Sequence, residues 1–306
     1  MIALTPLCQT ILEHYQVRKT AKQKLAFIEL MCDHFPDLKL QEGGFPKCRN
    51  IIIGDIENAK VVLTAHYDTC AQLPFPNFIT PKKPLLSVLY SVALIVPVVI
   101  AVFLLKQLLS IISIDFWIQY WLTVAVYFGF VFLLLAGPAN KHTANDNTSG
   151  VITLCELLSV LPAPQRSQAA FVFFDHEETG LIGSSLFRSK YKKQMKNKLL
   201  INFDCVSDGD HILVSASKKA RAEFAKLIKD SFEPIGDKTI LFEKAEKIYY
   251  PSDQMGFPKT VAVAALKQKR FWGYYMDRIH TSRDTVFDKE NIKLLCDSIH
   301  RLLKQI

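Results

Sequence analysis

The chain has 306 residues, of which 50% are apolar, and carries a formal net charge of +8. This length is enough for one large domain with a full core or for two small ones, and the apolar content is high for a soluble enzyme. The sequence contains no motif typical of nucleic-acid binding, so we exclude nucleic acid as the partner of its positive charge. The seven cysteines are scattered without CxxC spacing, which indicates reduced, mostly buried thiols in the cytosol. Residues 1–24 lack a basic start followed by an apolar core, so we expect no secretory signal peptide.

The first predicted elements are a helix and two strands. Residues 20–35 have apolar side chains at helical spacing, and residues 50–54 and 60–64 are short apolar runs typical of strands. Residues 55–59, between the two runs, are interpreted as the turn of a β-hairpin. This interpretation predicts that the two strands are neighbours in a sheet.

Two long uncharged segments follow, at residues 85–105 and 116–136. Each has 21 residues, so as a helix it would be roughly 31 Å long, about the thickness of the hydrocarbon core of a bilayer. Trp117, Tyr120 and Trp121 cluster at the start of the second segment, as in an interfacial aromatic belt. The pattern predicts two transmembrane helices.

The charges around these segments predict their orientation. The outer flanks carry Lys82, Lys83 and Lys141, whereas the joining segment, residues 106–115, is less basic and too short to hold a domain. Because basic flanks face the cytoplasm, we expect a multi-pass protein of the cell membrane with two helices and both ends in the cytosol.

This interpretation predicts the domain organisation. Residues 84–136 form an inserted transmembrane hairpin, and residues 1–83 and 137–306 together form one domain that faces the cytoplasm. The alternative is a buried helix pair or a dimerisation surface of a soluble oligomer, since either of these could have the same apolar composition as a transmembrane hairpin.

The remainder of the chain alternates between strands and helices. Continuous apolar runs predict strands, and amphipathic stretches predict helices, at the following residues: strands 169–174, 199–203 and 261–266, and helices 149–161, 224–232 and 292–303. This alternation predicts an α/β fold with a mixed, mostly parallel central sheet flanked by helices.

Five short stretches carry side chains suited to chemistry: residues 65–68, 144–147, 175–178, 202–204 and 279–281. In three of them the candidate side chains follow a predicted strand, and parallel strands bring their carboxyl ends to one edge of a sheet. Acids that converge there without basic partners repel one another unless a cation neutralises them. Mixed histidine and carboxylate donors suit zinc, with manganese or cobalt as alternatives. Taken singly, each stretch is weak evidence for a metal site, because an isolated HxD or Glu-Glu is usually a surface feature.

Taken together, the stretches resemble the co-catalytic zinc peptidase family that includes bacterial leucyl aminopeptidases, glutamate carboxypeptidases and glutaminyl cyclases. The matching segments are VVLTAHYDT from residue 61, ANDNTSGV from 144, FVFFDHEETGLIGS from 171, LINFD from 200, Ser252-Asp253 and IHTSRDT from 279. They cover essentially the whole chain outside the hairpin.

The resemblance implies a site with two zinc ions. It assigns the metal ligands to His66, Asp146, Glu178, Asp204 and His280. Asp146 would bridge the two ions, with His66 on one and His280 beside Glu178 on the other. Asp68 would orient His66 through its free ring nitrogen. Glu177 would be the general base, removing a proton from a water molecule held between the metals.

The activity implied first is that of an aminopeptidase acting on peptides. A carboxypeptidase or a glutaminyl-cyclase-like acyl transferase is the alternative, and a catalytically silent membrane scaffold is a further one. Arg270, Arg278 and Arg283 lie near the last ligand and would recognise a substrate carboxylate in a carboxypeptidase. Four tyrosines are candidates for lining the substrate pocket: Tyr249, Tyr250, Tyr274 and Tyr275. His142 and His176 adjoin the motifs, and we expect neither to bind metal.

The position of the hairpin predicts where the chemistry occurs. It separates His66 from Asp146 by 80 positions, so both its ends are tied to the metal site. We therefore expect the active-site edge to face the membrane and the substrate to be a membrane-proximal peptide. The basic run at residues 188–198 is expected to support docking on an anionic bilayer, although a solvated helix face is the alternative.

Overall fold

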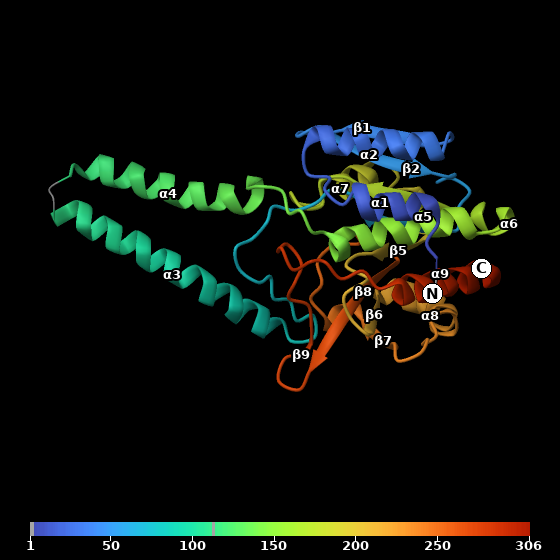
Figure 1. Ribbon diagram of the computed structural model, residues 1–306. Helices are drawn as coiled ribbons and strands as arrows, with labels where there is room; N and C mark the ends of the chain where they lie inside the picture. Colours follow the sequence, from blue (N-terminus) through green and yellow to red (C-terminus); the bar gives the residue numbers. More distant parts are fainter. Residues whose placement is uncertain (1–2, 112–113) are drawn as a thin grey trace.

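The computed structural model describes residues 3–111 and 114–306 and shows a nine-stranded sheet covered by helices, from which two long helices project (Figure 1). The strands are β1 (Lys39–Gly43), β2 (Cys48–Ile53), β3 (Val61–His66), β4 (Ala169–Phe174), β5 (Leu199–Phe203), β6 (His211–Ala216), β7 (Thr239–Lys244), β8 (Thr260–Lys269) and β9 (Gly273–Tyr275). Their order in the sheet is β1-β2-β4-β3-β5-β8-β6-β7, with β9 paired to β8.

The helices complete the architecture. They are α1 (Pro6–His14), α2 (Ala21–His34), α3 (Pro84–Ile111), α4 (Phe116–Ala136), α5 (Gly150–Val160), α6 (Ala163–Arg166), α7 (Ile182–Lys190), α8 (Lys218–Ser231) and α9 (Lys289–Gln305), together with the π-helical η1 (Ala144–Ser149) and the 3-10 turns η2 (Gln194–Lys196) and η3 (Ala245–Lys247). The sheet and the helices that cover it, residues 3–83 and 137–306, are called the α/β region below.

The centre of the sheet is parallel and fully buried. Strands β4, β3, β5 and β8 run in the same direction, while the outer pairings β1-β2, β2-β4, β6-β8 and β8-β9 are antiparallel. Every residue of β3, β4 and β5 is buried, as their continuous apolar runs predict. The predicted α/β fold with a mixed central sheet flanked by helices is confirmed.

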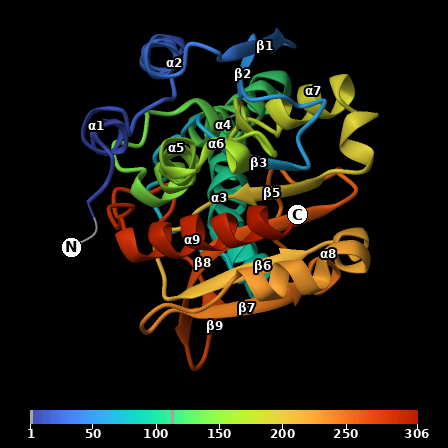
Figure 2. The same cartoon turned by 90° about the vertical axis from the view of Figure 1, so that its right-hand side faces the viewer.

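Alternate residues of the central strands enter two different cores. Val61 and Leu63 pack in the larger core under α1, α5 and α9, whereas Val62 packs with Phe187 of α7 on the other face. Figure 2 views the molecule from the side away from the two long helices, and α5 and α9 lie in front of the sheet there. This alternation follows from the two-residue period of a strand.

The predicted hairpin turn at residues 55–59 is wrong. In the structure β4 lies between β2 and β3: Ile52 pairs with Val172 in antiparallel fashion, and Leu63 pairs with Phe171 in parallel fashion. A short polar turn can connect two strands that are neighbours in the sheet, and it can also connect two strands that have a third strand between them. The more apolar β4, which begins 103 positions after the end of β3, takes the place between them because it buries both faces there.

The hairpin helices α3 and α4 leave the α/β region on one side and converge at their far ends (Figure 1). No residue of α3 is buried, and Gln119 is the single buried residue among the described side chains of α4. Both helices are long and apolar enough to cross a membrane. A buried pair in a soluble core would be covered, which these helices are not.

The boundaries of the hairpin agree with the sequence in α4 and differ in α3. The second helix spans residues 116–136 as predicted, and Asp115 caps it by accepting hydrogen bonds from the N–H groups of Trp117 at 2.9 Å and Ile118 at 3.4 Å. The first helix continues past the expected end at residue 105 through Lys106 to Ile111. A single lysine ends an uncharged run but does not end a helix, because lysine is a good helix former.

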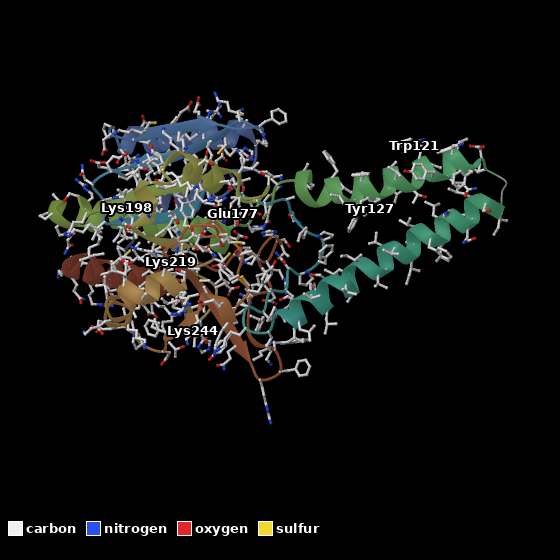
Figure 3. The ribbon with its side chains drawn as sticks, turned by 180° about the vertical axis from the view of Figure 1, so that it is seen from behind. Trp121, Tyr127, Glu177, Lys198, Lys219 and Lys244 are labelled. Atoms are coloured by element: carbon white, nitrogen blue, oxygen red, sulfur yellow. The ribbon has the colours of Figure 1, made fainter. Side chains whose placement is uncertain are left out.

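The basic run at residues 188–198 does not lie where we expected it. Its last residues precede β5 and therefore lie at the amino edge of the parallel strands, away from the hairpin. Figure 3 shows Lys198 at the far end of the α/β region and Glu177 toward the hairpin. Lys198 donates there to the carbonyl of Glu57 at 2.9 Å. This position argues against the expected docking of the whole run on the bilayer.

A buried ion pair fixes α2 to the end of β4. The Nζ atom of Lys24 lies 2.7 Å from Oδ1 of Asp175, and their side chains are 7% and 1% exposed. Lys24→Ala is expected to lower the free energy of unfolding by about 3–5 kcal/mol, because Asp175 would remain buried without its cation. Denaturant unfolding of the detergent-purified protein measures this loss. A loss no larger than that of Lys22→Ala, on the exposed face of the same helix, would contradict it.

Candidate active site

The five predicted donor residues meet at the carboxyl edge of the parallel strands. His66 is the last residue of β3, Asp204 directly follows β5, and Glu178 lies four residues after β4. Asp146 comes from η1, between the hairpin and α5, and His280 from the loop between β9 and α9. The structure therefore brings together residues that are up to 214 positions apart in the chain.

Asp146 lies at the centre of this cluster. Its Oδ1 atom is 3.3 Å from Nε2 of His66, and its Oδ2 atom is 2.9 Å from Nε2 of His280. On the first side His66 Nε2 also lies 3.5 Å from Oδ1 of Asp204, and on the second His280 Nε2 lies 3.3 Å from Oε2 of Glu178. The cluster thus has two halves, each with one histidine and one carboxylate of its own, which share Asp146.

The donor set suits metal binding. His66, Asp146 and Glu178 offer ligand atoms within 4.8 Å of one another, and so do His66, Glu177 and Asp204. The Oε1 atom of Glu178 is buried and has no hydrogen-bond partner among the residues that the structure describes. A buried acceptor without a partner costs free energy, and a cation at this position removes that cost.

The charges of the cluster are unbalanced without a cation. Burial raises the pKa of Glu178 to about 8 and that of Glu177 well above its usual range. Burial disfavours the charged form of His280, but the carboxylates of Glu178 and Asp146 outweigh it and raise its pKa to about 9. All three pKa values are raised, so the cluster favours protonation and its negative charges are not fully compensated by the histidines. Divalent cations are the ordinary solution for such a site.

Asp68 connects the two chain segments that carry His66 and Glu177. Its Oδ1 atom accepts a hydrogen bond from the backbone N–H of Glu177 at 3.0 Å, and Oδ2 accepts from Glu178 at 3.2 Å. The Nδ1 atom of His66 faces the backbone carbonyl of Asp68 at 3.1 Å, with the carboxylate 3.7 Å away. Asp68 therefore contacts the free nitrogen of His66 as expected, but through its carbonyl, and its carboxylate holds the Glu177-Glu178 turn.

Two further buried acids lie near the donor residues, and neither was assigned a role from the sequence. Asp284 accepts hydrogen bonds from the backbone N–H groups of Asn145 at 2.8 Å and Asp146 at 3.0 Å, which fixes the central carboxylate. Asp253 is fully buried, burial raises its pKa to about 7, and neither of its carboxylate oxygens has a hydrogen-bond partner within the described chain. Both residues lie inside matching segments, IHTSRDT and Ser252-Asp253. The sequence alone does not show whether such a buried carboxylate binds metal, accepts hydrogen bonds from backbone N–H groups or does neither.

A cavity of about 150 Å³ opens beside the cluster. Asn77, Cys205, Tyr250 and Ile279 line it together with the donor residues and Glu177. Of the four candidate tyrosines, Tyr250 is the one that lines this cavity, and its hydroxyl donates to the carbonyl of Asp204 at 3.1 Å. The remaining three do not border it: Tyr249 is exposed, Tyr274 packs edge-on against His211 and Tyr275 borders a different cavity.

The two adjacent histidines lie outside the cluster. His142 is exposed. His176 turns its Nε2 toward Nζ of Lys24 at 3.0 Å and its Nδ1 toward Oγ1 of Thr179 at 2.9 Å. Neither histidine belongs to a group of potential metal ligands among the described residues.

Comparison with known proteins adds a family and a fold. Residues 126–302 match peptidase family M28, a segment that includes Asp146, Glu178 and His280 but not His66, which lies beyond the hairpin. No curated protein sequence matches the chain.

Solved structures of peptidases and a cyclase share the fold. The aminopeptidase LapA of Legionella pneumophila aligns with a TM-score of 0.55 and 12% identity over 98% of this chain and 68% of its own. The glutaminyl cyclase of Porphyromonas gingivalis aligns with a TM-score of 0.55 and 14% identity over 97% and 96% of the two chains. A Zn-dependent exopeptidase from Parabacteroides distasonis gives a TM-score of 0.55 and 14% identity over 97% and 94%. At these identities the likeness concerns the fold alone.

Proposed function

The chain belongs to peptidase family M28, and on this basis we propose that it is a membrane-anchored, two-zinc metallopeptidase that acts as an aminopeptidase. The observation that carries the proposal is the shared position of Asp146, with a separate histidine and carboxylate on either side. His66 and Asp204 would hold one ion and His280 and Glu178 the other, with manganese or cobalt as alternatives to zinc.

The residues of the chain then have distinct tasks. Zinc supplies a Lewis acid that activates water and polarises the scissile carbonyl. The carboxylate of Glu177 takes the proton of the attacking water and passes it to the leaving amine nitrogen. Burial raises the pKa of Glu177, which makes its carboxylate a stronger proton acceptor. The carboxylate of Asp68 positions Glu177 by binding its backbone N–H.

The positions of the arginines favour an aminopeptidase over a carboxypeptidase. None of the three arginines considered for binding a substrate carboxylate lines the cavity. Arg278 lies 3.3 Å from Asp208, Arg283 donates to the carbonyl of Asp277 at 2.8 Å, and Arg270 follows β8 on the surface. A free amine would instead meet the acidic cluster itself.

The hairpin supplies the proposed location. We place α3 and α4 across the cell membrane with the α/β region as one catalytic domain on the cytoplasmic side. Support comes from the exposure of both apolar helices and from Lys82, Lys83 and Lys141 at their outer ends. The substrate would be a peptide at the membrane surface or released from it.

A peptide panel tests the activity. Detergent-purified protein is given peptides with a free or blocked N-terminus, a free or amidated C-terminus, and an N-terminal glutamine, each with and without chelator and zinc add-back. We expect zinc-dependent cleavage that requires a free N-terminus. A requirement for the free C-terminus would indicate a carboxypeptidase, and ammonia release from glutamine a cyclase. Absence of both turnover and bound metal would leave a silent scaffold.

The role of Asp68 gives a separate prediction. Asp68→Asn replaces one of two accepting oxygens with an NH₂ group that faces a backbone N–H, so the Glu177-Glu178 turn loses its anchor. We expect kcat/KM to fall about 10–100-fold at saturating zinc. Asp55→Asn is the matched control, because Asp55 also accepts backbone N–H groups but in an exposed turn. Equal activity of both variants would refute the positioning role.

A further inference from the structure

The carboxyl edge of the sheet carries two exposed turns tipped by aromatic side chains, which we call the aromatic turns. The β1-β2 turn, residues 44–47, presents Phe45, which is 98% exposed, and the β8-β9 turn, residues 270–272, presents Phe271, which is 72% exposed. Among the described residues outside the hairpin, these are the two most exposed large apolar side chains. Single exposed apolar side chains are common on protein surfaces, so it is the position of these two that matters.

Strand direction places both turns on the edge that holds the metal cluster. β2 is antiparallel to β4 and so begins where β4 ends. β8 is parallel to β5 and continues for six residues past Val263, which pairs with the last residue of β5, so its turn projects beyond the same edge. In the order of the sheet, β2 and β8 lie on opposite sides of β3 and β5, the strands that deliver His66 and Asp204. The aromatic turns therefore flank the active site.

The β8-β9 turn is also fixed to the first turns of α3. Lys83, directly before the helix, donates from Nζ to the carbonyl of Phe271 at 3.1 Å. The ring of Trp272 packs edge-on against Phe78 at 5.0 Å, and Phe78 against Tyr90 of α3 at 5.6 Å. Figure 1 shows β9 beside the base of this helix. If α3 enters a bilayer, this turn lies at the depth of the headgroups.

The charges of this region suit an anionic surface. Lys269 and Arg270 form no ion pair within the described chain. Next to them, a cavity of about 470 Å³ between the turn and α3 has apolar walls that include Leu86 and Leu89, and it also borders Lys269 and Arg283. Apolar walls with cations beside them match the boundary between acyl chains and anionic headgroups.

We propose that the two aromatic turns rest in the headgroup layer of an anionic membrane and hold the active-site edge against it. This rests on the membrane anchoring proposed above. The bilayer is the occupant, rather than a second copy of the chain, because the turns continue the surface from which α3 and α4 leave and carry aromatic and basic residues typical of interfaces. The active site then faces the membrane surface, and its substrates are peptides that already lie on that surface.

Trp272 can report this contact directly. The chain has three tryptophans, so Trp117→Phe with Trp121→Phe leaves Trp272 alone. The full-length double variant is reconstituted into phosphatidylcholine vesicles, with or without phosphatidylserine, that contain a headgroup-attached quencher lipid. We expect quenching of Trp272 fluorescence that strengthens with phosphatidylserine. Adding Lys269→Glu and Arg270→Glu should remove most of that quenching.

Controls separate docking from anchoring. Val160 is exposed at the end of α5, away from the carboxyl edge, so Val160→Ser should leave the quenching unchanged. Protein that leaves the vesicles in a carbonate wash would refute the anchoring, and the docking with it. Protein that stays in the vesicles while Trp272 is quenched no more than in detergent would overturn the docking alone. If Trp272 instead becomes protected from the quencher as the protein concentration rises, whatever the lipid, the turns contact a second copy of the chain. This result would also overturn the docking proposal.

Discussion

Glu177→Ala is expected to lower kcat by about 10²–10⁴-fold while the protein keeps its bound zinc. The side chain lines the cavity beside the cluster, yet it forms no ion pair with His66 or His280 among the described residues. Proton transfer from water to the leaving amine thus loses its carrier, while the assigned ligands remain. Kinetics on a peptide with a free N-terminus, together with metal analysis, measure both effects.

Two companion variants make this result specific. Glu177→Gln retains the shape of the side chain but cannot accept the proton, so its loss should be similar to that of alanine. Glu246→Ala removes an exposed carboxylate paired with Arg221 and should leave kcat unchanged. Full activity of Glu177→Ala would refute its role as general base. Loss of zinc from the same variant would instead assign Glu177 to the ligands.

The central part of the fold was predictable from the sequence because its residues are buried on both faces. The runs at 169–174 and 199–203 have no polar alternation, which restricts them to the middle of a parallel sheet, and both strands have those bounds in the structure. The hairpin was predictable for a related reason, since a bilayer-length uncharged segment has few stable alternatives. Pairing between strands was not, because neighbours in a sheet are selected by contacts between distant segments, as β4 shows between β2 and β3.

The sequence indicated which side chains meet at the carboxyl edge of the sheet, whereas the contacts that hold them in place could not be predicted. His66 and Asp204 belong to stretches that coincide with strand ends, and Asp146 belongs to a stretch whose order relative to them is specific. Asp284 supports Asp146 through backbone N–H groups, and any sequence offers such groups at every residue except proline. The basic run at residues 188–198 shows a similar limit. Its charge can be counted in the sequence, but the edge of the sheet at which it lies depends on the direction of the strand that follows it.

If the proposed two-zinc site is correct, Asp146→Ala is expected to remove both zinc ions, whereas Asp204→Ala should remove the ion on the His66 side and retain the other. The reason is the geometry of the cluster: each oxygen of Asp146 faces a different histidine, whereas Asp204, among the described residues, is paired with His66 and not with His280. Without Asp146 each half keeps one histidine and one carboxylate, too few donors for a tightly held zinc. Metal analysis after dialysis gives the zinc content of each variant, and Asp297→Ala, on the surface of α9, is the control.

Zinc-dependent stability tests the same assignment independently of activity. A ligand that binds the folded chain but not the unfolded chain raises the stability of the fold. A chelator should therefore lower the melting temperature of the parent protein, and added zinc should restore it. In Asp146→Ala the chelator should have no effect, because no ion remains to be removed, and in Asp204→Ala the shift should be smaller than in the parent. Should Asp146→Ala retain both ions and its full zinc-dependent shift, the central position of this carboxylate would have no role in metal binding. The two halves would then have to be independent sites, each completed by donors other than Asp146.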